Sequence, residues 1–261
     1  MIIQGRVVDF LFVAFLFVLT YVLARLTWIP SIRKIAAFDG IKEAVGRAVE
    51  MGRPVHMTPG TGSLNANESG PALIAGLATI AYAAELCASM KTPFIISLGS
   101  SDAIALTDQL LRQSFMVAGR SPEEYDPSVI RYFPGRDTIG SSLAFTNSVQ
   151  GLMAREKPAA NLMVGPFYGE QIALCEVAAK EGAIQIGGTQ STTQISIFAA
   201  LTDYHIIGEE IFAAGAYVSK DPTQAKMIAA EDVAKIIAIA LISLNALLIM
   251  LGLRILPFLQ V

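Results

Sequence analysis

The chain has 261 residues, of which 53% are hydrophobic and 16% are charged, whereas typical globular proteins have about 25% charged residues. This composition makes a membrane segment the first expectation. The net charge of −3 provides no basic field for a nucleic acid backbone, so we expect no nucleic acid partner.

The apolar residues are concentrated near the two ends of the chain. Residues 7–29 and 236–256 are each long enough to cross a ~30 Å hydrocarbon layer as a helix, at about 1.5 Å of rise per residue. We therefore predict one N-terminal and one C-terminal transmembrane helix. A secretory signal is the alternative for the first segment, but no A-x-A-like cleavage site follows it. Tyr21 and Trp28 suit a membrane interface.

The positive charges near the two spans predict their orientation. On the side that faces the central region lie Arg25, Arg33, Lys34, Lys42, Lys220, Lys226 and Lys235. The outer tails carry only Arg6 and Arg254. The positive-inside rule then places the central region in the cytoplasm, next to the inner membrane, and both termini outside. The expected organisation is a transmembrane helix at 1–30, an α/β domain at 31–220, and a stalk with a second transmembrane helix at 221–261.

A helix is expected directly after the first span, because residues 41–51 have apolar side chains at helical spacing. Glu43 precedes Arg47 by four positions, which favours an ion pair on the helix surface. Gly52 and Pro54 should end this helix.

Five short apolar runs follow, and each precedes a longer stretch with helical patterning. They predict strands at residues 54–58, 93–98, 129–133, 161–165 and 183–187. Strands that alternate with helices indicate an α/β fold, with a Rossmann-like, mostly parallel sheet flanked by helices. The helix at 71–90 is apolar almost all round, so the domain or a partner should bury both its sides. The helix at 102–118 is amphipathic.

The last helix of the domain is expected to continue into the second span. Asp221 suits its N-cap and Pro222 its first position, and no helix breaker follows before Pro257. One continuous helix would then leave the cytoplasm and cross the membrane.

The two cysteines, Cys87 and Cys175, lie far apart in predicted helices and form no C-x-x-C motif. We expect buried, small apolar side chains in a reducing compartment.

Candidate ligand-binding residues follow the predicted strands, because open parallel sheets bind ligands at the carboxyl ends of their strands. They are Thr58, Gly60, Thr61, Gly62, Ser63, Asn65, Ser100, Ser101, Asp102, Gly135, Arg136 and Asp137. A structural explanation remains open: Asp102, Asp137 and Thr192 are good N-caps, and glycines allow tight turns without a ligand.

The segment "HMTPGTGSLN" at residues 56–65 is the strongest candidate for binding a small anionic or nucleotide-like ligand. Its glycines expose backbone N–H groups near the positive end of the following helix. Gly60 and Gly62 match the first two glycines of G-x-G-x-x-G, but Asn65 replaces the third, and the chain has no G-K-[ST]. We therefore predict no particular cofactor. Arg136 could contact a phosphate, or it could pair with Asp137.

No set of residues predicts a catalytic or metal site. His205 could act as a base with Asp203 as its partner, but we find no nucleophile and no G-x-S-x-G motif. His56, on a predicted strand, is more typical of a packed structural histidine. Glu209 and Glu210 lack metal-ligand spacing relative to the histidine. An enzyme is therefore less expected than a structural or a ligand-binding protein.

Residues 60–120, 161–189 and 205–218 together resemble a prokaryotic family of membrane-anchored α/β proteins that is catalogued only as a domain of unknown function. The resemblance implies the same topology. It brings no activity, cofactor or catalytic residue.

Three classes of function remain, and the first is a homo-oligomeric structural or scaffolding component of the membrane. A small-molecule binding or sensory module and an enzyme are the others.

Asn245 lies near the middle of the second span, where an amide needs a partner, so we expect it at a helix contact between subunits rather than facing lipid. The helix at 71–90 and the segment 212–217 are expected to help bury a subunit interface.

Overall fold

The computed structural model describes residues 7–25, 33–135, 141–219 and 222–250. The chain divides into two compact units. One is Arg33–Val218, and the other combines Met1–Ile32 with Ser219–Val261.

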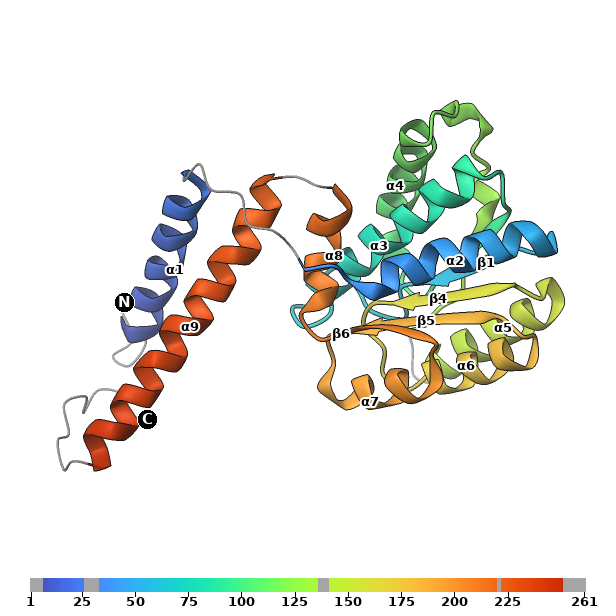
Figure 1. Cartoon of the computed structure of the whole chain (residues 1–261). Helices are drawn as coiled ribbons and strands as arrows, with labels where there is room; N and C mark the ends of the chain where they lie inside the picture. Colours follow the sequence, from blue (N-terminus) through green and yellow to red (C-terminus); the bar gives the residue numbers. More distant parts are fainter. Residues whose placement is uncertain (1–6, 26–32, 136–140, 220–221, 251–261) are drawn as a thin grey trace. The chain divides into compact units, whose positions relative to one another are not determined.

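A six-stranded sheet forms the centre of the unit Arg33–Val218 (Figure 1). Its strands are β1 (Val55–Thr58), β2 (Phe94–Leu98), β3 (Ile130–Tyr132), β4 (Ala160–Val164), β5 (Ile184–Thr189) and β6 (Tyr204–Ile207). All neighbouring strands are parallel, and their order is β3-β2-β1-β4-β5-β6. This is the strand order of dinucleotide-binding α/β folds. The predicted α/β class and parallel sheet are confirmed.

The strand β6 was missed by the sequence prediction, which ended the sheet at β5. It has only four residues and lies at the edge of the sheet. Only Ile206 is fully buried among them, so the apolar signal of this strand is weak.

The first face of the sheet is covered by α2 (Ala36–Met51), α3 (Gly70–Ser89), α4 (Ile104–Val117) and α8 (Glu210–Ser219) (Figure 1). The core there includes Phe38, Met57, Leu77 and Ile96. As predicted, α3 is largely buried: it packs on the sheet and against α2 and α4. Ile74 on α3 remains 54% exposed.

The second face is covered by α5 (Ser141–Glu156), α6 (Gln171–Lys180) and α7 (Thr192–Leu201) (Figure 1). Phe145 of α5 and Phe198 of α7 are fully buried in its core. Cys175 lies in this core and Cys87 in the other, and both are buried free thiols, as predicted.

The ends of the helices follow the predicted signals in part. Helix α2 ends at Gly52, which has a left-handed backbone. Asp102 is not the N-cap of α4: it lies within the short 3-10 helix Ser101–Ala103, and its side chain binds another loop. Thr192 is the first residue of α7, and the N-cap is Ser191.

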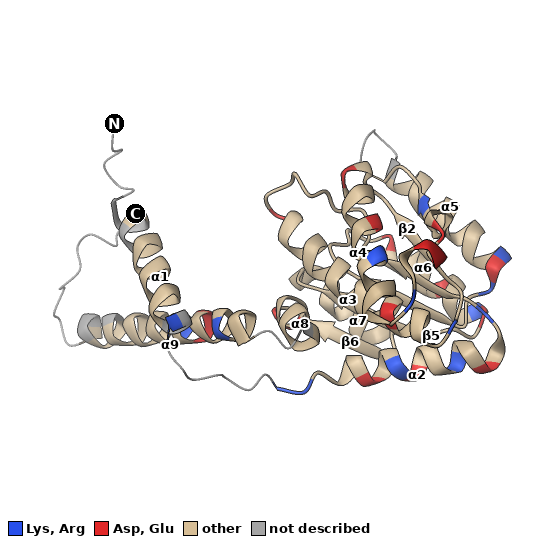
Figure 2. Ribbon diagram, turned by 90° about the horizontal axis from the view of Figure 1, so that it is seen from above, with Lys and Arg blue, Asp and Glu red and all other residues tan. Residues whose placement is uncertain are grey.

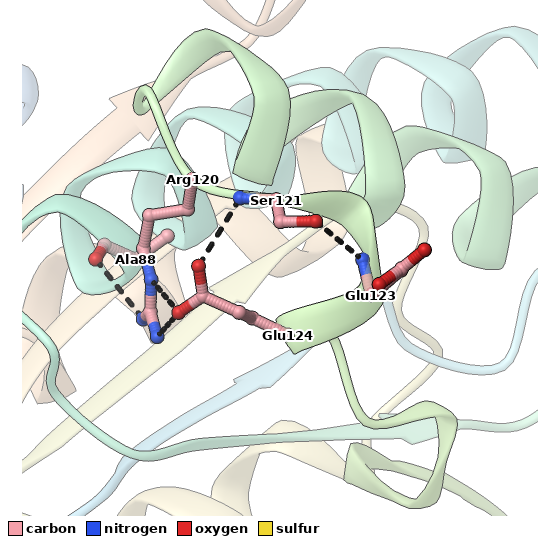
Figure 3. A network of polar contacts seen from close by, with 5 residues as sticks. All are labelled: Ala88, Arg120, Ser121, Glu123 and Glu124. Carbon is pink, nitrogen blue, oxygen red and sulfur yellow. Dashed lines mark hydrogen bonds and ion pairs between the residues drawn. The ribbon is translucent and has the colours of Figure 1, made fainter.

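A compact polar network holds the loop that follows α4 (Figure 3). Arg120 forms an ion pair with Glu124 and donates a 3.3 Å hydrogen bond to the carbonyl oxygen of Ala88, at the end of α3. Glu124 accepts from the N–H of Ser121, and the Ser121 hydroxyl accepts from the N–H of Glu123, which forms a capping box. The network ties the loop to α3.

The second unit contains α1 (Val7–Arg25) and α9 (Pro222–Met250), which pack against each other. Pro222 begins α9 as predicted, whereas its predicted N-cap, Asp221, lies outside the described residues. The charged residues of α9 lie in its first half (Figure 2). Elsewhere on both helices large apolar side chains are exposed: Phe17 is 73% exposed and Ile242 is 70% exposed.

Within the described ranges, α3 is the one helix that is long and apolar enough, by length and composition, to span a membrane. Of its apolar window, 56% is buried inside the domain, as in the core helix of an α/β fold. A shorter apolar helix lies at Phe12–Val22, within α1, and another is α7.

Candidate functional site

The carboxyl ends of β1 and β4 form the switch point of the sheet. These strands are neighbours, and the chain leaves β1 for α3 on one face and β4 for α6 on the other. In sheets of this order, ligands bind at this point. Here it is flanked by the β1 loop, residues 59–69, and the β4 loop, residues 165–170.

The glycines of the β1 loop allow the β4 loop to approach it closely. A Cβ atom on Gly60 would lie 2.5 Å from the carbonyl oxygen of Pro166, and one on Gly62 would lie 2.2 Å from Cγ of the same proline. Gly60 also has φ = 82°, in the left-handed region that favours glycine. Packing between two loops of the protein therefore accounts for this glycine pattern without a ligand.

The Asp102 carboxylate accepts hydrogen bonds from backbone N–H groups of the β1 loop. Its Oδ2 atom accepts hydrogen bonds from the Ser63 hydroxyl at 2.7 Å and from the N–H of Leu64 at 2.9 Å. The N–H and the side-chain amide of Asn65 donate to the same oxygen at 3.4 and 3.2 Å. Burial acts to raise the pKa of Asp102, but the hydrogen bonds from Ser100, Ser63 and the backbone outweigh it and lower the pKa. The position predicted for a ligand anion thus holds a carboxylate of the protein.

A second carboxylate, Glu170, ties the two loops together. The Thr61 hydroxyl donates a 2.7 Å hydrogen bond to Oε1 of Glu170, and the N–H of Tyr168 donates to Oε2 at 2.9 Å. Thr61 and Glu170 are both buried. Sequence reasoning did not select Glu170, and the only signal for it is its place in "GPFYGE" after a predicted strand.

Most of the predicted ligand-binding residues do gather at this edge. Those joined there by the contacts above, or by direct packing of the loops after β1, β2 and β3, are Thr58, Gly60, Thr61, Gly62, Ser63, Asn65, Ser100, Asp102 and Gly135. Ser101 lies beside them and is exposed. Arg136 and Asp137 lie outside the described residues, as does the side chain of Asn245.

His56 takes part in a buried network inside the sheet. Its Nδ1 atom lies 2.8 Å from Oδ1 of Asn161 on β4, and its Nε2 atom lies 2.9 Å from the hydroxyl of Ser97 on β2. All three side chains are buried. Burial lowers the pKa of His56 to about 4, although the hydrogen bond with Asn161 acts to raise it. His56 is therefore neutral at pH 7 and joins three strands, which fits the structural explanation.

The other histidine that was considered as a base, His205, is exposed on β6. The neighbouring carboxylate of Asp203 accepts a 2.8 Å hydrogen bond from the N–H of Gln185. Glu210 forms an ion pair with Arg33. Within the described part of the chain, no three His, Cys, Asp or Glu side chains form a group that could hold a metal ion.

Comparison with known proteins gives a family and no activity. Neither a curated protein nor a solved structure matches the chain significantly. One family model, a domain of unknown function (DUF6754), matches residues 3–258, which is nearly the whole sequence. The chain belongs to this family.

Proposed function

We propose that the chain is a membrane-anchored structural protein that assembles with copies of itself. The observation that carries this proposal is the exposure of large apolar side chains on α1 and α9. Ile236, Ile239, Leu241, Ile242, Leu244 and Leu247 point in all directions around the second half of α9, and all are more than half exposed. A helix that is apolar all round requires lipid or another chain around it.

The proposed anchor consists of the two spans at residues 7–29 and 236–256. The basic residues on the domain side of both spans support a cytoplasmic domain with both termini outside. Cysteines introduced at Gln4 and Glu50 test this orientation with an impermeant maleimide in intact cells. We expect labelling at residue 4 alone, and labelling at residue 50 alone would overturn the orientation.

The contacts at the switch point argue against ligand capture there. Asp102 and Glu170 already bind the polar groups of the β1 loop, and Pro166 packs on its glycines. The most ligand-like loop of the sequence thus has a structural role. A second copy of the chain would instead cover the apolar second half of α9 and would provide a hydrogen-bond partner for the amide of Asn245.

Native mass spectrometry and crosslinking in mild detergent test the assembly. We expect wild type to form a closed oligomer, and Asn245→Leu to loosen it by about 0.6 to 2 kcal/mol per contact. Ser243→Leu is the control, because it also removes a polar group from α9 but at an exposed position on another side of the helix. A strictly monomeric wild-type protein would refute the proposal.

A small anionic ligand at the switch point is the second candidate, and the strand order favours it. Such a ligand would have to displace Asp102 from the β1 loop. Inorganic phosphate and AMP are the probes, with Asp102→Asn as the variant. Tighter binding of either probe to the variant would support this candidate, and no binding to either protein would exclude it.

A further inference from the structure

Four neighbouring strands each contribute one buried polar side chain to the second face of the sheet. The residues are Ser97 on β2, His56 on β1, Asn161 on β4 and Gln185 on β5, and none is more than 5% exposed. Residues 57, 96, 162 and 186 next to them belong to the core of the first face. Because side chains alternate between the two faces along a strand, the four polar side chains share the second face. They form a polar row across the sheet.

Hydrogen bonds join the first three members of the polar row. Nε2 of His56 lies 2.9 Å from the Ser97 hydroxyl, and Nδ1 lies 2.8 Å from Oδ1 of Asn161. An amide oxygen accepts hydrogen bonds and cannot donate them. In the neutral imidazole, Nδ1 therefore carries the proton and donates to Asn161, and Nε2 accepts from Ser97.

The amides of Asn161 and Gln185 each have one buried atom without a hydrogen-bond partner. The atom of Asn161 is Nδ2, a donor, and the atom of Gln185 is Oε1, an acceptor. The two residues are paired in register on β4 and β5, where neighbouring strands lie about 4.8 Å apart. Nearly all buried polar atoms in proteins are hydrogen-bonded. A rotation about the side-chain torsions of Gln185 would let this donor and this acceptor satisfy each other.

We propose that Gln185 accepts a hydrogen bond from Asn161 and thereby fixes the tautomer of His56. With Nδ2 bound to Gln185, Oδ1 of Asn161 stays directed at Nδ1 of His56, which keeps the imidazole proton on that nitrogen. If the Asn161 amide turned over, it would present a donor to Nδ1, and the proton would move to Nε2. Gln185 is thus a positioning residue for a histidine two strands away. The inference does not depend on the proposed assembly.

The completed polar row also joins the two halves of the sheet. These halves, β3-β2-β1 and β4-β5-β6, meet between β1 and β4. The bond between His56 and Asn161 crosses that junction. Because hydrogen bonds in a buried chain polarise one another, a change at Gln185 should be felt at His56.

Nitrogen NMR of the full chain in detergent, labelled with ¹⁵N at histidine, reads the tautomer at neutral pH, because a ring nitrogen changes its chemical shift when it carries the proton. The chain has two histidines, so His205→Gln identifies the signals of His56. We expect the proton on Nδ1 of His56 in wild type. A proton on Nε2 in wild type would overturn the proposal.

Gln185→Met removes the acceptor and keeps an unbranched side chain. It should lower Tm by about 2–4 °C, as expected for one hydrogen bond in a domain of this size, and it should populate the second tautomer of His56. Gln171→Met is the matched control, because Gln171 is also buried and its amide bonds to Gln194 outside the polar row. It should lower Tm and leave the tautomer of His56 unchanged. An unchanged tautomer in Gln185→Met, or the same change in both variants, would refute the proposal.

Thr92→Val shows how a buried polar group without a partner behaves. The Thr92 hydroxyl is buried and has no hydrogen-bond partner, so its removal should not lower Tm. Gln185→Met should be less stable than this variant. Equal Tm values for Gln185→Met and Thr92→Val would mean that Gln185 forms no bond with Asn161.

Discussion

The hydroxyl of Ser63 donates a 2.7 Å hydrogen bond to the carboxylate of Asp102, which lies 39 positions further along the chain. The same carboxylate accepts from the N–H groups of Leu64 and Asn65. Glycine-rich loops after the first strand of such sheets commonly hold a ligand phosphate. In this protein the carboxylate of Asp102, which follows β2, accepts hydrogen bonds from these groups of the β1 loop in place of a ligand phosphate.

Asp102→Asn should destabilise the domain by about 1–3 kcal/mol, because it replaces a charged acceptor of several hydrogen bonds by an amide. Urea unfolding of the detergent-solubilised chain measures the change. Glu176→Gln is the control, since it removes a carboxylate from an exposed ion pair with Lys180 and should change stability by less than about 0.5 kcal/mol. Equal effects of the two variants would show that the Asp102 contacts contribute nothing particular.

The contribution of Asp102 should depend on pH in a defined direction. Its hydrogen bonds lower the pKa in the folded state below the ordinary value of 3.8. The unfolded chain therefore binds the proton first as the pH falls, and the stabilisation that is present above about pH 3.9 is lost below it. The difference in the free energy of unfolding between wild type and Asp102→Asn should therefore shrink as the pH falls below about 3.9.

His56 should make stability depend on pH in a higher window. The folded state lowers its pKa from 6.5 to about 4, so between these values the unfolded chain takes up a proton that the folded chain does not. Stability should fall as the pH is lowered from about 6.5 to about 4, with a slope that approaches 1.4 kcal/mol per pH unit.

The variants His56→Gln and His205→Gln separate this effect from other titrations. The first should flatten the slope between about pH 6.5 and pH 4, since it removes the buried imidazole. The second removes the exposed histidine of β6 and should keep the wild-type slope. An unchanged slope in His56→Gln would contradict the assignment.

Local patterns predicted the elements of this fold better than they predicted its contacts. Five of the strands and the end of α2 at Gly52 follow from apolar runs and breakers in the sequence. The short edge strand β6 does not, because little of it is buried. The pairing of Thr61 with Glu170 joins residues 109 positions apart, and no local pattern reports such a distance. The glycines at 60 and 62 were interpreted as a cradle for an anionic ligand or as a tight turn, whereas in the structure Pro166 packs against them, and no local pattern reports that contact.

Gly62→Ala should destabilise the domain by about 1–3 kcal/mol, because the added methyl group overpacks the contact with Pro166. Gly46→Ala is the matched control. Gly46 lies inside α2 with nothing within 4 Å of an added Cβ, so alanine there should stabilise the protein by about 0.5–1 kcal/mol. Thermal unfolding compares the two, and a stabilising Gly62→Ala would mean that the loops are not packed as described.

The middle of α1 packs beside the first half of α9. A groove of about 350 Å³ lies between these helices, lined by Leu16 and Thr20 of α1 and by Ala230, Ala234 and Ala238 of α9. If residues 7–29 and 236–256 crossed a bilayer side by side, residue 16 would instead lie level with residue 248. Residue 248 is 14 positions beyond Ala234, so at about 1.5 Å per residue the two registers differ by roughly 21 Å.

Paired cysteines distinguish these registers with a short bifunctional maleimide. Leu16→Cys with Ala234→Cys should crosslink within one chain, and Leu16→Cys with Leu247→Cys should not. The native thiols should give little background, because burial raises the pKa of Cys87 and raises that of Cys175 to about 12. The reverse result would favour the two level spans of the proposed anchor. The expected result would place the ion pair of Glu231 with Lys235 beside the apolar middle of α1, and it would contradict a second span that lies level with residues 7–29.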